Sequence, residues 1–409
     1  MPRMNATKPV NLASGKIMVE VAVSQVSLHS HSFLNFHLVF LSSTSTSNIS
    51  SLFRTASPSS NMTTNDLSRD ATLSMPPDDS ISSLSWSPTA NFLAVGSWDN
   101  RVRIYDVRTV QTGTGIAAID FEGPVLACDW SKDGTKVAGA GADRSAKLLD
   151  LNANGGPAQT VSSHDAPIRS IRFFNMPNAS APMLVTGSWD KSVRYWDLRQ
   201  RTPVATLACQ DRVYAMDVME QLLVIGTAEK HIHIVDLKAP TTIFETRASP
   251  LKEQTRVVSC FSDTSGFAIG SIEGRCGLQY VAQKDQSRNF AFRCHRTLPD
   301  KDSMVQIYTV NAISFHPIHG TFSTAGSDGT FNFWDKDAHN RLKGYPSVGA
   351  PISATAFNMD GTIFAYAVSY DWHKGYTFNT SQHVNKVMLH PIAPDDCKPR
   401  AAVAAAGRR

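Results

Sequence analysis

Histidine and cysteine are the side chains here that would bind a metal, but their spacing does not favour a metal site. His316, His319 and His339 cluster in segments that read HPIHG and DAHN, which are typical of loop histidines beside a proline turn. The six cysteines are scattered, form no CxxC pair and lie mostly in hydrophobic runs. We therefore expect buried, reduced thiols, as in an intracellular protein, and no metal or disulfide role.

The sequence also lacks the short motifs of the common catalytic sites. It has no phosphate-binding loop, dinucleotide-binding glycine motif, G-x-S-x-G nucleophile motif or H-E-x-x-H zinc motif. The composition, 42% hydrophobic and 18% charged, is that of a globular protein, and the net charge of +4 is too small to demand nucleic acid. These observations predict a binding protein with no active site and no cofactor.

Carboxylates do recur at one place in a repeated pattern, in which a β-rich run leads to a G-S-x-D turn and then to a second β-rich run. Seven copies begin at Ser80, Pro124, Pro167, Arg212, Arg256, Asn311 and Pro351. The turns place a carboxylate at Asp99, Asp143, Asp190 and Asp328, with glutamate at Glu229 and Glu273. These residues could serve acid–base chemistry or a structural hydrogen-bond network, and we favour the structural role.

The period of the repeat predicts an all-β, seven-bladed β-propeller. Matching aromatic or aliphatic positions from Tyr105 to Trp334 are separated by 44, 47, 39, 44 and 55 residues, and alternation within each copy is typical of strands. One blade cannot bury both of its faces, so each packs on its neighbours and the ring closes. We expect the segment before Ser80 to supply the last strand of the final blade.

The copies resemble WD repeats, with Trp196-Asp197 and Trp334-Asp335 at the ends of their third strands. This resemblance implies that the aspartate of each turn anchors a buried hydrogen-bond network. It also places the x residue of each turn at one mouth of the propeller. Trp98, Trp189 and Tyr370 are the large aromatics at these positions, and exposed aromatics on turns are typical of peptide-binding anchors.

A second candidate surface lies at the edge of the fifth and sixth blades, where aromatic and basic residues are interleaved. Phe292 and Trp334 are its aromatics, and its cations are Arg293, Arg296, Lys336, Arg341 and Lys343. Such an edge suits a single-stranded nucleic-acid backbone or an acidic peptide, although a solvated charged rim is an equal alternative.

We divide the chain into an extension (1–61), the propeller (62–390) and a basic, Ala-rich tail (391–409). The extension is rich in Ser, Thr and Asn and is predicted to be disordered. Its one apolar run, near residues 33–41, is too short to cross a bilayer. Met62 looks like a natural start, so we consider the extension dispensable.

Several segments, including GSIEGR, NFAFRCHR and FHPIHGT, together resemble the family of WD-repeat mRNA export factors of the nuclear pore over residues 75 to 400. The resemblance implies a non-enzymatic adaptor in the nucleus and at the nuclear envelope, with cytoplasmic shuttling. Its partners would be the GLEBS segment of an FG nucleoporin and single-stranded poly(A) RNA, and an mRNA export receptor is a further candidate. Arg275 matches a residue implicated in the GLEBS contact, and no membrane partner is implied.

Two other functions stay open. A related spindle-checkpoint family binds similar peptides on kinetochore proteins. Substrate receptors of cullin-type ubiquitin ligases carry a WDxR pattern, which Tyr105 to Arg108 and Trp196 to Arg199 fit.

Overall fold

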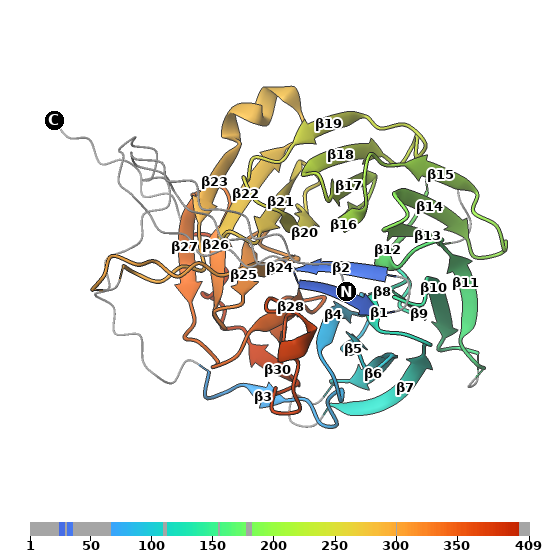
Figure 1. Cartoon of the computed structure of the whole chain (residues 1–409), viewed down its shortest axis with the longest axis horizontal. Helices are drawn as coiled ribbons and strands as arrows, with labels where there is room; N and C mark the ends of the chain where they lie inside the picture. Colours follow the sequence, from blue (N-terminus) through green and yellow to red (C-terminus); the bar gives the residue numbers. More distant parts are fainter. Residues whose placement is uncertain are drawn as a thin grey trace, which may run out of the picture.

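The computed structural model describes residues 24–28, 31–35, 67–108, 113–153, 156–176, 182–299 and 301–400. Figure 1 shows seven sheets set around a common centre, as the sequence predicts. Each of these sheets has four antiparallel strands, which are consecutive along the chain in six of them, whereas the seventh takes its outer strand from the other end of the propeller. The fold is therefore a seven-bladed β-propeller.

The blades are numbered along the chain, with the innermost strand first. Blades one and two contain β4 (Ile81–Trp86), β5 (Phe92–Ser97), β6 (Arg101–Asp106), β7 (Thr114–Asp120), β8 (Val125–Trp130), β9 (Lys136–Gly141), β10 (Ser145–Asp150) and β11 (Gln159–Ser163). Blades three and four contain β12 (Ile168–Phe174), β13 (Met183–Ser188), β14 (Ser192–Asp197), β15 (Ala205–Ala208), β16 (Val213–Met219), β17 (Leu222–Thr227), β18 (His231–Asp236) and β19 (Glu245–Ala248). Blades five and six contain β20 (Thr255–Cys260), β21 (Gly266–Ser271), β22 (Arg275–Tyr280), β23 (Phe290–Arg293), β24 (Val310–Phe315), β25 (Phe322–Gly326), β26 (Phe331–Asp335) and β27 (Asn340–Gly344). Blade seven contains β28 (Ile352–Phe357), β29 (Ile363–Val368), β30 (Lys386–Pro391) and β3 (Ala71–Thr72).

The ring closes by pairing the two ends of the propeller, which confirms the expected role of the segment before Ser80. Strand β3 is the outer strand of blade seven, with Ala71 opposite Leu389 and Thr72 opposite Met388. The Leu73 backbone N–H then donates to the Val387 carbonyl at 2.9 Å. The Leu73 side chain is 1% exposed and packs in the cluster shared by blades one and seven.

Each junction between neighbouring blades has its own apolar cluster, so the core is a set of seven wedges. Between blades one and two, for example, Val102 and Ile104 pack with Val125 and Trp130. Equivalent clusters fill the other six junctions. Burial of both faces of each sheet is the main driving force for the stack.

Every innermost strand carries a register shift near its first residues. Between Ile168 and Ser170, for example, one residue has no partner on β13, and the other six inner strands show the same irregularity. A β-bulge of this kind re-aims the extra side chain. Here the extra side chains line the central channel.

The ordered C-terminal segment extends beyond the boundary expected at residue 390. Asp396 accepts hydrogen bonds from Lys343 and Tyr345 of blade six at 2.9 and 3.0 Å. Cys397 is 2% exposed, and Thr321 donates to its carbonyl at 2.7 Å. The propeller unit therefore includes this segment, which covers the junction of blades six and seven.

The predicted disorder of the extension falls mostly outside the described residues. Two described segments, β1 (Ser24–Leu28) and β2 (His31–Asn35), pair antiparallel as a separate two-stranded sheet. The helical elements of the described residues are two 3₁₀ turns, η1 (Gln283–Arg288) and η2 (Tyr376–Phe378).

Because β3 closes the ring, Leu73→Ala is expected to cost about 2–4 kcal/mol of unfolding free energy by leaving a cavity. Urea denaturation followed by tryptophan fluorescence measures the change. Met75→Ala, at a side chain 66% exposed two residues away, is the control and should change stability by less than about 0.5 kcal/mol. Equal stability of the two variants would contradict closure through β3.

Candidate peptide and nucleic-acid interfaces

The aspartate of the blade-three turn anchors a buried chain of hydrogen bonds. Trp196 Nε1–H donates to Thr186 Oγ1 at 2.8 Å, and Thr186 Oγ1 lies 2.7 Å from His164 Nε2. His164 Nδ1 is 2.8 Å from Asp190, which also accepts from the Ser192 hydroxyl at 2.6 Å. This network links the loop before β12 to β13, to β14 and to the turn between them.

Blade six contains the same arrangement. Trp334 Nε1–H donates to Thr324 Oγ1 at 2.9 Å, which lies 3.0 Å from His295 Nε2. Asp328 then contacts His295 Nδ1 at 2.9 Å and accepts from Thr330. The structural role expected for Asp190 and Asp328 is confirmed by these contacts.

The other turns carry shortened versions of this network. Asp99 pairs with Arg103 at 2.5 Å, and Asp143 accepts from the Ser145 hydroxyl at 2.9 Å. Glu273 is buried and accepts from the Lys252 backbone N–H at 2.9 Å. Glu229 is exposed at its turn, so blade four has replaced the buried carboxylate with a solvated one.

Burial sets the charge state of the blade-three network. It lowers the pKa of His164, which favours the neutral ring. With its proton on Nδ1, the neutral ring would donate to Asp190 and accept from Thr186. Burial alone would raise the pKa of Asp190, but hydrogen bonds from His164 and Ser192 hold it well below its usual range. A neutral histidine and an ionised aspartate give each donor of this hydrogen-bond network an acceptor.

The expected mouth exists, and two of its three predicted anchors lie at its rim. Trp98 and Trp189 are partly exposed and line the same central channel, a cavity of about 710 Å³. Trp98 stacks on Trp372 with ring centroids 3.9 Å apart. Trp372 also lines the channel and was missed by the sequence analysis because it lies two residues beyond the x position of its turn.

Tyr370, the third predicted anchor, does not present its ring to solvent. It is 2% exposed, its hydroxyl donates to the Gly375 carbonyl at 2.8 Å, and it stacks on His383 at 4.7 Å. The long β29–β30 loop folds back over this ring, so Tyr370 supports the loop, and Trp372 takes the exposed place.

Four arginines gather at the junction of blades five and six. Arg275 lies opposite Arg293 in the β22–β23 ladder. Burial, followed by the positive charges of Arg275 and Arg293, lowers the pKa of Arg296 to about 10. Arg296 and Arg341 line one pocket of about 210 Å³. We call these four residues the arginine cluster.

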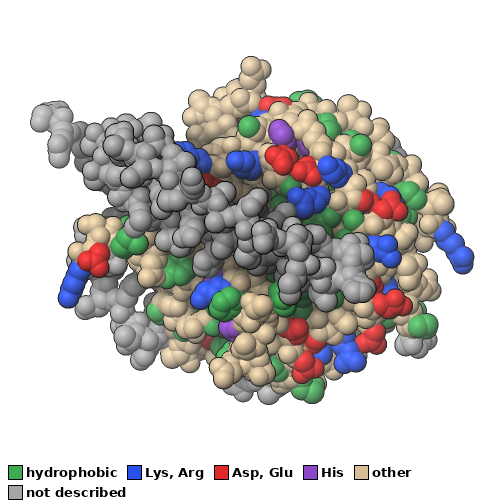
Figure 2. All heavy atoms as spheres, in the orientation of Figure 1, with side chains coloured by type: hydrophobic (Ala, Val, Ile, Leu, Met, Phe, Trp, Pro, Cys, Tyr) green, Lys and Arg blue, Asp and Glu red, His purple; other side chains and the backbone are tan. Residues whose placement is uncertain are grey.

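The arginines of this cluster differ in solvent exposure and in the hydrogen bonds that they make. Arg293 and Arg341 are exposed, whereas Arg296 donates to the Glu273 and Gly274 carbonyls at 2.6 and 3.3 Å. Arg275 lies 3.6 Å from the Glu273 carboxylate. Figure 2 shows Lys and Arg scattered among Asp and Glu on the described part of the face in view. That face therefore has mixed charge rather than one broad positive surface.

Two of the predicted edge cations are neutralised by acidic partners. Lys336 is 6% exposed and lies within 3.2 Å of Asp263 and 3.1 Å of Asp337. Lys343 pairs with Asp396 at 2.9 Å. The partners Asp263 and Asp396 come from distant parts of the chain, so the spacing of the two lysines in the sequence does not reveal these ion pairs.

The two predicted edge aromatics lie in the junction between blades five and six. Phe292 and Trp334 are each 6% exposed, and their ring centroids are 4.7 Å apart. They form an almost covered floor, not the free stacking surface that the sequence suggested. The Phe290 and His339 rings lie beside them, with centroids 3.9 Å apart and planes tilted by 41°.

The described residues contain no group of three or more His, Cys, Asp or Glu that could hold a metal ion. His316 and His319 stack at 4.6 Å, and the His316 ring accepts from the Ile318 and His319 backbone at 3.2 Å each. All six cysteines are buried and unpaired by disulfides. Within the described chain, no helix has the length and apolarity needed to cross a membrane.

The seven four-stranded sheets, the turn networks and the closing strand define the class of WD-repeat β-propellers. The WD domain, G-beta repeat model matches residues 69–106, 117–150, 155–197 and 293–335.

Comparison with known proteins narrows the class. The chain is 57% identical over 356 residues to the mRNA export factor GLE2 of Chaetomium thermophilum, covering 86% of this chain and 98% of that protein. It is 53% identical to the Poly(A)+ RNA export protein of Schizosaccharomyces pombe (82% and 94% covered) and 40% identical to Protein Rae1 of Drosophila melanogaster (81% and 96% covered). The chain belongs to this family of WD-repeat mRNA export factors.

The buried networks generate a stability prediction. Asp190→Ala is expected to cost about 3 kcal/mol of unfolding free energy, because it leaves His164 and Ser192 without their acceptor. Chemical denaturation measures the loss. Glu229→Ala, at the equivalent exposed turn, is the matched control and should be nearly neutral. A neutral Asp190→Ala would show that the network does not stabilise the blade.

Proposed function

We propose that the chain is a non-enzymatic adaptor in mRNA export. It would bind a GLEBS-type peptide of an FG nucleoporin at the mouth and single-stranded RNA at the arginine cluster. It would act in the nucleus and at the nuclear pore, and shuttle to the cytoplasm. The mRNA export and poly(A)+ RNA export roles named for its relatives support the export role, and the absence of a catalytic motif supports an adaptor rather than an enzyme.

The observation that carries the peptide site is the tryptophan rim. Trp98, Trp189 and Trp372 are partly exposed around one cavity. Large aromatic rings at the centre of an interface are typical of residues that dominate peptide affinity. Arg275 belongs to β22 of blade five, and its guanidinium can pair with an acidic group of the peptide.

The exposed pair Arg293 and Arg341 supports the RNA site. Both belong to outer strands, β23 and β27, so an extended strand can pass along the blade junction without entering the channel. Guanidinium groups bind phosphate through charge-assisted, bidentate hydrogen bonds. Phe292 and Trp334 would limit the depth of the site rather than stack fully on a base.

A second candidate is a substrate receptor of a cullin-type ubiquitin ligase. Arg108 and Arg199, of the two WDxR segments, have side chains 70% and 63% exposed and pair with Asp106 and Asp197. Pull-down with a GLEBS peptide, a kinetochore-type peptide and a ligase adaptor in parallel separates the candidates. Capture by the GLEBS peptide supports export, and capture by the adaptor alone favours the ligase.

Trp98→Ala combined with Trp189→Ala is expected to weaken GLEBS-peptide binding by at least roughly 2 kcal/mol, because two central anchors are lost. Isothermal titration calorimetry measures the affinity. Phe244→Ala, at a ring 65% exposed beside the outer edge of blade four, is the control and should bind normally. Unchanged affinity of the double variant would exclude the mouth as the site.

Arg293→Glu with Arg341→Glu is expected to weaken binding of a poly(A) oligonucleotide. It should also flatten the dependence of log affinity on log salt by about 1.4, for two lost phosphate contacts on a single strand. Fluorescence anisotropy over a salt series measures both. Arg101→Glu with Lys238→Glu makes the same change of net charge on blades one and four. An equal effect of this control would mean that overall charge, and not the cluster, determines binding.

A further inference from the structure

The register shifts of the seven inner strands place one unpaired residue of each blade in the central channel. Each shift leaves one residue between two paired positions, so the seven extra residues occupy equivalent places around the axis. All seven line the channel cavity. We call them the channel ring: Ser82, Leu126, Arg169, Tyr214, Arg256, Asn311 and Ser353.

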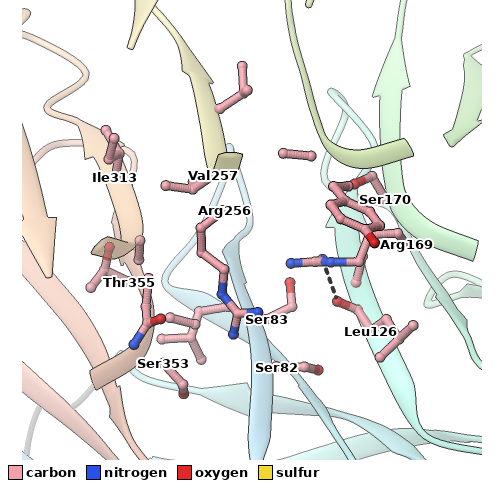
Figure 3. A pocket seen from close by; sticks show the side chains of 18 of the residues that line it. Ser82, Ser83, Leu126, Arg169, Ser170, Arg256, Val257, Ile313, Ser353 and Thr355 are labelled. Carbon is pink, nitrogen blue, oxygen red and sulfur yellow. Dashed lines mark hydrogen bonds between the residues drawn. The ribbon is translucent and has the colours of Figure 1, made fainter. Parts of the chain in front are cut away.

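Two members of the ring are arginines that lack a carboxylate partner. Figure 3 shows Arg169 of blade three and Arg256 of blade five directed toward each other inside the channel. Arg169 donates only to the Leu126 carbonyl, at 3.4 Å, and Arg256 donates to the Asp371 backbone carbonyl, at 3.1 Å. Neither guanidinium lies within 4.0 Å of an acidic side chain of the described residues.

The acidic groups of the channel wall are committed elsewhere. Arg172 pairs with Asp217 at 2.8 Å, while Asp129 accepts from the Phe173 backbone N–H at 2.8 Å and from Ser85. The Asp371 carboxylate accepts from Asn311, Ser327 and His373. These contacts leave both ring arginines without a carboxylate ion pair among the described residues.

Burial and the positive charges in and beside the channel ring lower the pKa of Arg169. Burial, followed by the positive charges of Arg256 and Arg172, lowers the pKa of Arg169 to about 10. The guanidinium is still protonated at pH 7, so the channel holds repelling cations in surroundings that screen them poorly. A bound anion would relieve this repulsion.

We propose that the channel ring is a binding site for a small phosphorylated anion, clamped between Arg169 and Arg256. A phosphate offers oxygens in several directions, so one group can accept from guanidiniums on both sides of the channel. Ser83 Oγ accepts from the Cys128 backbone N–H at 3.2 Å, which leaves its hydroxyl hydrogen to donate to the same anion.

The channel has the size and access that this ligand needs. The same cavity of about 710 Å³ is lined by the ring and by Trp98 and Trp189 at the mouth. A short oligophosphate fits this space, and its entry route passes the tryptophan rim. The site is separate from the arginine cluster, whose pocket is lined by other residues.

Isothermal titration of the whole chain with tripolyphosphate and with orthophosphate tests the proposal. We expect saturable binding of one tripolyphosphate per chain, weakened at least about tenfold by Arg169→Gln and by Arg256→Gln. Without ligand, neither variant should have a lower melting temperature than the parent, since each removes repulsion. Arg169→Lys keeps the charge but loses the planar fork, and should retain part of the affinity.

Controls decide where the anion binds and which class of anion it is. Arg341→Gln removes a cation of the arginine cluster and should leave tripolyphosphate affinity unchanged; loss of binding in this variant alone would overturn the proposal. Glutarate tests an acidic peptide side chain as the occupant, and binding as tight as that of tripolyphosphate would also overturn it. Absence of saturable binding to the parent chain is equally decisive, because it requires no variant to fold.

Discussion

The burial of both faces of every sheet is the constraint on which the rest of this molecule depends. A four-stranded blade alone exposes two apolar faces, and the seven interblade clusters cover them in turn. The circle is complete only because β3 joins β30, from the other end of the propeller. The mouth, the channel and the outer edges are therefore held in fixed relative positions by the same packing.

Polar groups inside this packing are tolerated where they satisfy one another. In blades three and six a tryptophan, a threonine, a histidine and an aspartate form one continuous hydrogen-bonded chain. The tryptophan indole serves the network, so the WD dipeptide is a structural signal and not a recognition element. The side chains to which we assign recognition lie outside the networks: the tryptophans of the rim and the arginines of the outer strands.

The sequence predicted correctly the features that recur in every copy of the repeat. Seven blades, the closing strand and the structural aspartates all follow from positions that recur with the period of the blade. It was less informative about exposure. Lys336 and Lys343 have the spacing of a basic edge, but Asp263 and Asp396 neutralise them across the fold. Tyr370 fits the rim pattern, yet its loop covers it. The bulged arginines could not be found from strand alternation, because a bulge changes the direction of a side chain without changing the pattern around it.

The bulges have an evolutionary consequence for the protein's interior. A residue that takes no part in the ladder can be exchanged without removing a backbone hydrogen bond between strands. Mutation at these seven sites would thus alter the chemistry of the axial passage while keeping the backbone pairing of every blade. Propellers with nearly identical frames can in this way acquire passages of different polarity, one blade at a time.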